Sequence, residues 1–173
     1  PISFRNDELL DLLPDYSIEL CYSINVLHNG NLGVLFYLNK GEQRTMTLRT
    51  TRSQPSEIIG QIEIFILSDE EEMGISWLDV NPEYMNMDMR GVGIGTYLML
   101  IALSYSNYYS PEISLVELDD VSDSFANVDD PEEREELQLR NIYYKLGFRY
   151  EDDGPEMKGN IQDILRNNIT HFL

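Results

Sequence analysis

Cysteine, histidine and positive charge are scarce in this sequence of 173 residues. The single cysteine, Cys21, excludes an internal disulfide and leaves no thiolate cluster for zinc. Only two histidines, His28 and His171, are present, so a histidine-rich metal site or a Ser-His-Asp triad has little material. We therefore expect no metal, and the lone thiol indicates a reducing, intracellular compartment.

Long apolar runs are also missing. No stretch of 18 apolar residues occurs and no signal-peptide pattern opens the chain, so we expect a soluble, cytoplasmic protein. Apolar residues make up 42% and aromatic residues 10% of the composition, which is typical of a globular chain with a buried core. This length predicts a single domain over residues 1–173.

Acidic residues dominate the charge. The 31 Asp and Glu residues outnumber the 12 Lys and Arg residues, which gives a net charge of −19. Such a charge argues against binding nucleic acid or an anionic membrane. Ten acidic residues and one Arg lie between Glu117 and Glu136. Two interpretations stay open: a solvated, solubilising surface, or a negative field that concentrates a cationic amine.

Hydrophobic periodicity predicts an alternating α/β chain. We expect strands at residues 17–27, 32–38, 43–50, 58–67, 74–80, 113–118 and 148–151. We expect helices at residues 6–13, 93–106, 131–146 and 160–173. Residues 39–42 predict a hairpin turn, and residues 121–130 an acidic loop. The helix at 131–146 would start after Asp130 as N-cap, with one face formed by Leu139, Ile142, Tyr143 and Leu146.

A glycine-rich stretch, residues 90–96, has the sequence Arg-Gly-Val-Gly-Ile-Gly-Thr and lies between a predicted strand and a long apolar helix. Glycines at alternate positions let several backbone N–H groups converge on one anion. The helix adds its unpaired first-turn amides and the positive end of its dipole, so this order predicts a pyrophosphate seat. The spacing fits neither the Gly-x-Gly-x-x-Gly of dinucleotide folds nor a P-loop.

Two motifs resemble the GCN5-related N-acetyltransferase (GNAT) family. The first is this Arg-x-x-Gly-x-Gly loop, which follows Leu-Asp-Val-Asn-Pro-Glu-Tyr at residues 78–84. The second is Tyr-Tyr-Lys-Leu-Gly-Phe at residues 143–148. The resemblance covers residues 57–150, between a divergent part at 1–56 and a C-terminal strand and helical tail at 151–173. It implies an α/β (α+β) fold with a mixed, mostly antiparallel central sheet flanked by helices.

The resemblance also implies acetyl-coenzyme A as co-substrate and direct attack by an amine, without a covalent enzyme intermediate. Tyr143 matches the family's proton donor to the leaving thiolate. Its place on an apolar helix face fits a core aromatic equally well, and a phenol at a pocket edge can serve both roles. The implied coenzyme contacts lie on the strand, the loop and the helix start: Leu78, Asp79, Val80, Arg90, Gly91, Val92, Gly93, Ile94, Gly95 and Thr96.

A base is also needed, because an ammonium with a pKa of about 10 cannot attack a thioester until it loses a proton. The sequence offers Glu63 and Glu72 on or beside central strands. It also offers Asp119 or Asp120 at the end of the strand at 113–118. Each could equally be a surface charge, so the identity of the base stays open.

Two classes of function remain. In the first, the chain is an N-acetyltransferase acting on a cationic amine: a polyamine, or a lysine or amino terminus of a basic peptide. In the second, it is a catalytically silent domain of the same fold that senses coenzyme A or binds a basic protein. The acidic segment after Leu118 lies where the resemblance places the acceptor site, which favours the first. A departure from the family pattern in the helix at 131–146, Glu136 in place of an asparagine, favours the second. Val92 in place of a basic residue removes a possible phosphate contact. The tail at 160–173 either docks on its own sheet or joins two copies as a homodimer.

Overall fold

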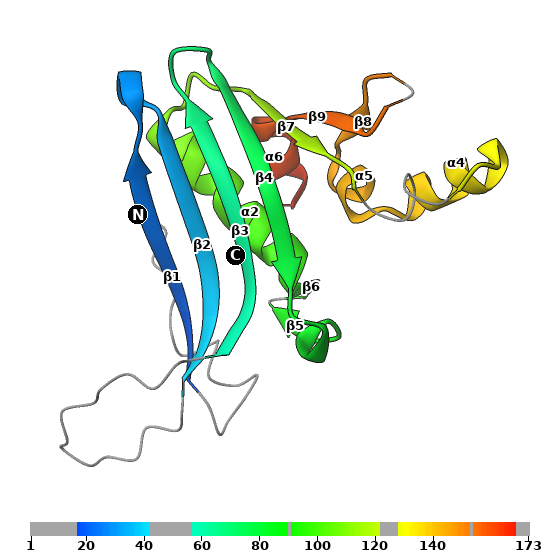
Figure 1. Ribbon diagram of the computed structural model, residues 1–173, viewed down its shortest axis with the longest axis horizontal. Helices are drawn as coiled ribbons and strands as arrows, with labels where there is room; N and C mark the ends of the chain where they lie inside the picture. Colours follow the sequence, from blue (N-terminus) through cyan, green and yellow to red (C-terminus); the bar gives the residue numbers. More distant parts are fainter. Residues whose placement is uncertain (1–16, 42–56, 90, 122–127, 153, 169–173) are drawn as a thin grey trace.

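A computed structural model of the chain describes residues 17–41, 57–89, 91–121, 128–152 and 154–168 (Figure 1). Its centre is a seven-stranded sheet in the order β1-β2-β3-β4-β7-β9-β8. The strands are β1 Ser17–Val26, β2 Leu32–Gly41, β3 Glu57–Leu67, β4 Glu72–Val80, β7 Leu115–Asp119, β8 Arg149–Tyr150 and β9 Glu156–Asn160. A separate two-stranded hairpin pairs β5 Asp88–Met89 with β6 Val92–Gly93.

The sheet is mostly antiparallel, and β4 with β7 is the one parallel pair among the described strands. The α-helices are α2 Ile94–Tyr109, α4 Pro131–Arg140, α5 Ile142–Leu146 and α6 Ile161–Asn168, and two 3-10 turns are η1 His28–Gly30 and η2 Pro82–Tyr84. This arrangement of a mixed, mostly antiparallel sheet with flanking helices confirms the expected fold class.

Helix α2 covers one face of the sheet because both surfaces are apolar (Figure 1). On β3, Ile62, Ile64 and Ile66 alternate along the strand and are fully buried. On the helix, residues from Ile94 to Leu103 are buried almost without interruption, as the sequence predicted for a helix packed against a sheet. Burial of this apolar surface is the main force that fixes α2 over the strands.

The predicted hairpin turn at residues 39–42 is wrong for its described part. Strand β2 continues to Gly41, and Asn39 and Lys40 pair with β1 on one side and β3 on the other. A strand with partners on both sides overrides local turn preferences, because its backbone groups are already satisfied. The helix predicted at 6–13 and the strand predicted at 43–50 lie outside the described residues.

The predicted single helix at 131–146 is also wrong, because it breaks at Asn141 into α4 and α5. Asn141 has extended backbone angles, φ −62° and ψ 137°, and its side chain caps the second segment. The face predicted to join Leu139 with Leu146 is therefore lost: the first is exposed and the second buried. The predicted start is confirmed, since the Asp130 carboxylate accepts a hydrogen bond of 3.1 Å from the Glu132 N–H.

Strand β9 lies in the part at 151–173 for which a C-terminal strand and a helical tail were expected, but periodicity did not locate it: the sequence indicated only a break at Gly154 and Pro155 before the tail. Its residues lie between β7 and β8 and pair with both. The described part of the tail forms α6, which packs back on this chain: the Gln162 amide donates to Asn107 of α2 at 3.1 Å. No helix in the part of the chain that the structure describes has the length and apolarity to span a bilayer.

Candidate active site

The short strand β7 lies beside only the first half of the longer β4 (Figure 1). Residues Glu72–Ile75 of β4 pair with β7, whereas the rest of β4 pairs only with β3. The register with β3 shifts so that Glu63 faces Trp77 and Ile64 faces Ile75, which leaves Ser76 as the extra residue of a β-bulge. Within the described chain, β4 therefore presents unpaired backbone groups from Ser76 to Val80, where an extended ligand can add as a strand.

The glycine loop lies beside this free edge in space, and residues 81–89 connect the two along the chain. Gly91 has φ +82°, which suits glycine, and it links β5 to β6. Gly93 is the N-cap of α2, with φ −66° and ψ 160°, and a Cβ built on it would meet no atom within 4 Å. The first N–H groups of α2, from Ile94 to Thr96, have no partner within the helix. Arg90 lies outside the described residues.

The end of β4 packs against the start of α2 and leaves open space beside the loop. Leu78 and Val80 pack toward α2, each 3.7 Å from the position of a Gly95 Cβ, whereas Asp79 is exposed. The backbone of Gly93 and the first turn of α2 thus have open space beside them and favour an anion through their N–H groups and dipole. These features fit the pyrophosphate of coenzyme A, and the contact through Arg90 stays a prediction.

Gly60 of β3 is a site residue that the sequence analysis missed. A Cβ on Gly60 would lie 2.9 Å from Ile94 Cγ2, 3.1 Å from Leu98 Cδ1 and 3.3 Å from the Asp79 oxygen. The missing side chain therefore lets the first turn of α2 pack directly on the sheet. An isolated glycine inside an alternating strand was the available signal, because it indicates a close approach.

Helix α5 reaches the same place. Ile142 Cδ1 lies 3.7 Å from the position of a Gly95 Cβ, so the start of α5 contacts the start of α2. The next residue, Tyr143, is partly buried and its ring packs edge-on against Phe148, with the ring centroids 6.2 Å apart. Its hydroxyl has no hydrogen-bond partner among the described residues. Tyr143 thus packs in the core and still carries an available hydroxyl.

The environment keeps the Tyr143 hydroxyl protonated. Burial raises the pKa of this phenol above its ordinary value, and the negative charge of Asp120 raises it further. The neighbouring Tyr144 is oriented differently, with its ring covered by the Arg149 guanidinium at 4.0 Å from the ring centroid. Of the two tyrosines, Tyr143 is therefore the one that packs against Phe148 and senses the charge of Asp120.

Asp120 is a fully buried carboxylate at the end of β7. One of its oxygens accepts hydrogen bonds from the Asn141 amide at 3.1 Å and from the Tyr150 hydroxyl. Its own N–H donates to the Pro155 oxygen at 2.8 Å. The sequence analysis named Asp120 beside Asp119 but missed Asn141 and Tyr150. An asparagine directly before a helical segment was the available signal for Asn141.

The other predicted bases lie apart from this group. Glu63 accepts a hydrogen bond from the Trp77 indole, on the sheet face opposite α2. Glu72 is at the far end of β4, about 26 Å from Val80 at roughly 3.3 Å per residue. Asp119 is exposed and faces Glu156 of β9. The structure therefore brings only Asp120 close to Tyr143.

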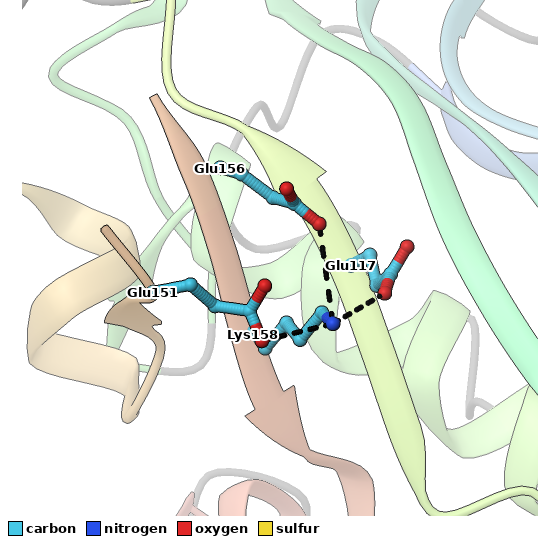
Figure 2. A network of polar contacts seen from close by, with 4 residues as sticks. All are labelled: Glu117, Glu151, Glu156 and Lys158. Atoms are coloured by element: carbon cyan, nitrogen blue, oxygen red, sulfur yellow. Dashed lines mark ion pairs between the residues drawn. The ribbon is translucent and has the colours of Figure 1, made fainter. Parts of the chain in front are cut away.

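A surface ion-pair cluster lies on β7 and β9, beside this network (Figure 2). The Lys158 ammonium is 2.8 Å from Glu151, 3.1 Å from Glu117 and 4.0 Å from Glu156. Hydrogen bonds that the ammonium donates to Glu151 and Glu117 raise the pKa of Lys158. These three glutamates are thus committed to an ion pair. No group of described His, Cys, Asp or Glu residues could hold a metal ion.

Comparisons with known proteins find several similar solved structures, among them GCN5 from Tetrahymena and nourseothricin acetyltransferase. No family model and no curated protein matches the sequence. GCN5 from Tetrahymena is 16% identical with a TM-score of 0.36, and the match covers 72% of this chain and 68% of that one. Nourseothricin acetyltransferase is 13% identical with a TM-score of 0.40, and the match covers 91% and 95%. Because both TM-scores are below 0.5, the function proposed below depends on the geometry of this chain and on its two motifs.

Proposed function

We propose that this chain is an acyltransferase that moves the acetyl group of acetyl-coenzyme A to an amine by direct attack. One observation supports this most: the free edge of β4 lies beside the first turn of α2 that follows the glycine loop, and α5, which carries Tyr143, contacts that turn through Ile142. The pantetheine arm would pair with Leu78–Val80, and the pyrophosphate would bind the N–H groups that follow Gly93.

The chemistry requires two proton transfers. The amine nitrogen attacks the carbonyl carbon, the C–S bond breaks, and the sulfur leaves as a thiolate. Tyr143 would protonate that thiolate, because its raised pKa keeps the hydroxyl in the donor form. A backbone N–H on the free edge of β4 would stabilise the negative charge on the carbonyl oxygen. The proton lost by the amine would pass to a carboxylate or to water.

A cationic amine is the substrate class that the charge favours. The net charge of −19 attracts a polyamine or a basic peptide and repels the polyanionic coenzyme, so the coenzyme depends on backbone dipoles. The acidic helix α4, with Glu132, Glu133, Glu135 and Glu136 exposed, directly precedes α5 in the chain. It would add to this attraction.

The alternative is a catalytically silent domain that binds coenzyme A or a basic protein. Glu136 favours it, because it replaces a residue that the family resemblance leads us to expect. Both functions share coenzyme binding, so turnover is what separates them.

Calorimetric titration of acetyl-coenzyme A, with desulfo-coenzyme A and NAD as comparison ligands, tests the seat. Gly93→Leu is the key variant, because the backbone there accepts any residue and the side chain would fill the open space. Gly154→Leu is the matched control, since a Cβ on Gly154 also meets no atom within 4 Å. We expect the coenzyme A compounds to bind, Gly93→Leu to abolish that binding and Gly154→Leu to preserve it. Unchanged affinity in Gly93→Leu would show that the coenzyme does not bind at the glycine loop.

Tyr143→Phe tests the chemical step. Loss of a general acid should lower kcat by about 10²- to 10⁴-fold, with little change in the KM for acetyl-coenzyme A. Tyr108→Phe is the control, because Tyr108 is an exposed tyrosine of α2. Thiol release with spermidine or a lysine-rich peptide is the assay. A normal kcat in Tyr143→Phe contradicts the acid role, and binding without turnover of any amine favours the silent domain.

A further inference from the structure

The buried carboxylate of Asp120 is the most unusual polar group outside the residues that would touch substrate. Asp120 is fully buried, although an isolated carboxylate is expensive to remove from water. Hydrogen bonds from Asn141 and Tyr150 to the same oxygen offset this cost. Removing one partner of a buried charge destabilises the fold, whereas an apolar side chain at the same position would be buried without this penalty. Stability alone therefore does not explain a carboxylate at position 120.

Asn141 links that carboxylate to the start of α5. Its amide nitrogen donates to Asp120 at 3.1 Å, and its amide oxygen accepts from the Tyr143 N–H at 2.7 Å. An ionised carboxylate can accept hydrogen bonds but cannot donate them, so Asp120 binds the NH2 group of the Asn141 carboxamide and not its oxygen. This contact fixes which way the carboxamide points. The amide oxygen is thereby held as the cap of α5.

Helix α5 depends on its caps because it has only five residues. At its end, Gly147 has φ +121° and donates to the Tyr143 and Tyr144 oxygens. At its start, the carboxamide of Asn141 is the cap. Tyr143 lies in this short capped segment, so a change in the cap would move its hydroxyl. Displacement of a reacting group by about 1 Å can cost about 100-fold in rate.

We propose that Asp120 is a positioning residue for acetyl transfer: through the carboxamide of Asn141 it fixes the first turn of α5 and hence the Tyr143 hydroxyl. This inference rests on the proposed function only for its kinetic consequence. In this role Asp120 neither contacts the substrate nor transfers a proton.

The charges around Tyr143 give a second, independent readout of the same link. The titratable groups in this part of the structure are Asp120, directly after β7, Arg149 and Tyr150 on β8, and Tyr144 and Lys145 on its own helix. Of these, Asp120 is the one whose charge raises the pKa of Tyr143, in addition to burial. Removing this charge should therefore lower the Tyr143 titration midpoint even when no substrate is present.

The first experiment titrates Tyr143 by NMR in protein labelled with ¹³C at the tyrosine ring carbon that bears oxygen, and Tyr143→Phe assigns the signal. Asp120→Asn keeps the size of the side chain but removes its charge. Asp129→Asn is the control, because it removes an equal charge at an exposed position. We expect a lower midpoint in Asp120→Asn and no change in Asp129→Asn. An unchanged midpoint in Asp120→Asn overturns the link, whether or not the chain is an enzyme.

The second experiment is kinetic. Asp120→Asn introduces an NH2 donor beside the acceptor oxygen, so the side chain at 120 no longer fixes which way the carboxamide of Asn141 points. This variant should lower kcat about tenfold or more and leave the KM for acetyl-coenzyme A unchanged. It should cost nothing further in the Tyr143→Phe background. Asn141→Ser keeps a capping oxygen but cannot reach Asp120, so it should lower kcat without unfolding the protein. Equal losses of kcat for Asp120→Asn in both backgrounds would show that Asp120 acts independently of Tyr143 and refute the proposal. If wild-type protein shows no turnover, the proposed function fails while the NMR result still decides the link.

Discussion

Gly60 offers the sharpest test of how the sheet positions the start of α2. In Gly60→Ala the new methyl carbon would lie 2.9 Å from Ile94 Cγ2 and 3.1 Å from Leu98 Cδ1. Carbon atoms prefer separations of about 3.5–4.0 Å, so the helix start must move outward. The third neighbour, the backbone oxygen of Asp79 at 3.3 Å, belongs to a paired strand and has little room to give way.

The expected magnitude follows from two opposing terms. Overpacking a core position costs about 1–3 kcal/mol. Replacing glycine by alanine returns about 0.4–1 kcal/mol by restricting the unfolded chain. The net loss should be about 1–2 kcal/mol, which lowers Tm by about 2–8 °C in a domain of this size. Because Ile94 begins α2, affinity for acetyl-coenzyme A should fall as well.

Thermal unfolding and calorimetric titration measure these two effects. Gly74→Ala is the matched control, since it lies on the adjacent strand β4 and a Cβ there meets no atom within 4 Å. Ile94→Leu removes the branched methyl group nearest the new atom, so in this background the cost of Gly60→Ala should shrink. The reasoning is refuted if Gly60→Ala is as stable as Gly74→Ala, or if the Ile94→Leu background leaves its cost unchanged.

Two further predictions concern charge and pH. Raising the salt concentration screens exposed charges, so the KM for spermidine should rise while the KM for acetyl-coenzyme A falls, because the net charge of −19 attracts one and repels the other. Steady-state kinetics at several salt concentrations check this, and two KM values that move in the same direction contradict it. Burial, and then the charge of Asp120, raise the pKa of Tyr143 in the folded state. The contribution of the protonated Tyr143 to stability is therefore fully present below the unfolded pKa of about 10, and it is lost as pH rises through the folded pKa. Urea unfolding should therefore show a smaller alkaline loss of stability in Tyr143→Phe than in wild type, and equal losses would mean that Tyr143 is not perturbed.

Sequence patterns found the elements whose signals are local. Strand β3 alternates Ile62, Ile64 and Ile66, and α2 is apolar along most of its length. The predicted ranges, 58–67 and 93–106, therefore lie close to the observed bounds of both elements. The glycines at 91, 93 and 95 stand out in the sequence in the same way, and their role as a pyrophosphate seat stays a prediction. Each of these signals is complete within about a dozen residues.

The elements that failed depend on partners far away in the chain. Strand β9 contains Lys158 and Gly159 and alternates weakly, yet it forms because β7 and β8 pair with its two edges. The helix break at Asn141 depends on a carboxylate 21 positions earlier, which no periodic pattern reveals. For the same reason Tyr143 could be identified from its motif, whereas the burial of Asp120 could not. Non-local pairing outweighs local preference at each of these positions.

The break at Asn141 also bears on the choice between an enzyme and a silent domain. The family resemblance places an asparagine at the position of Glu136, and its absence favoured the silent domain. In the structure that position lies on α4, which has no buried residue and is separated from α5 by the extended backbone of Asn141. A substitution on this solvated segment takes nothing from the group formed by Asp120, Asn141 and Tyr143. Val92 is then the departure that lies in the glycine loop, where the proposed function leads us to expect an effect on coenzyme affinity rather than on chemistry. We therefore expect Val92→Lys to tighten acetyl-coenzyme A binding while kcat stays the same; calorimetry and saturating kinetics on one preparation measure both, and a kcat that rises with affinity would show that the loop limits turnover as well.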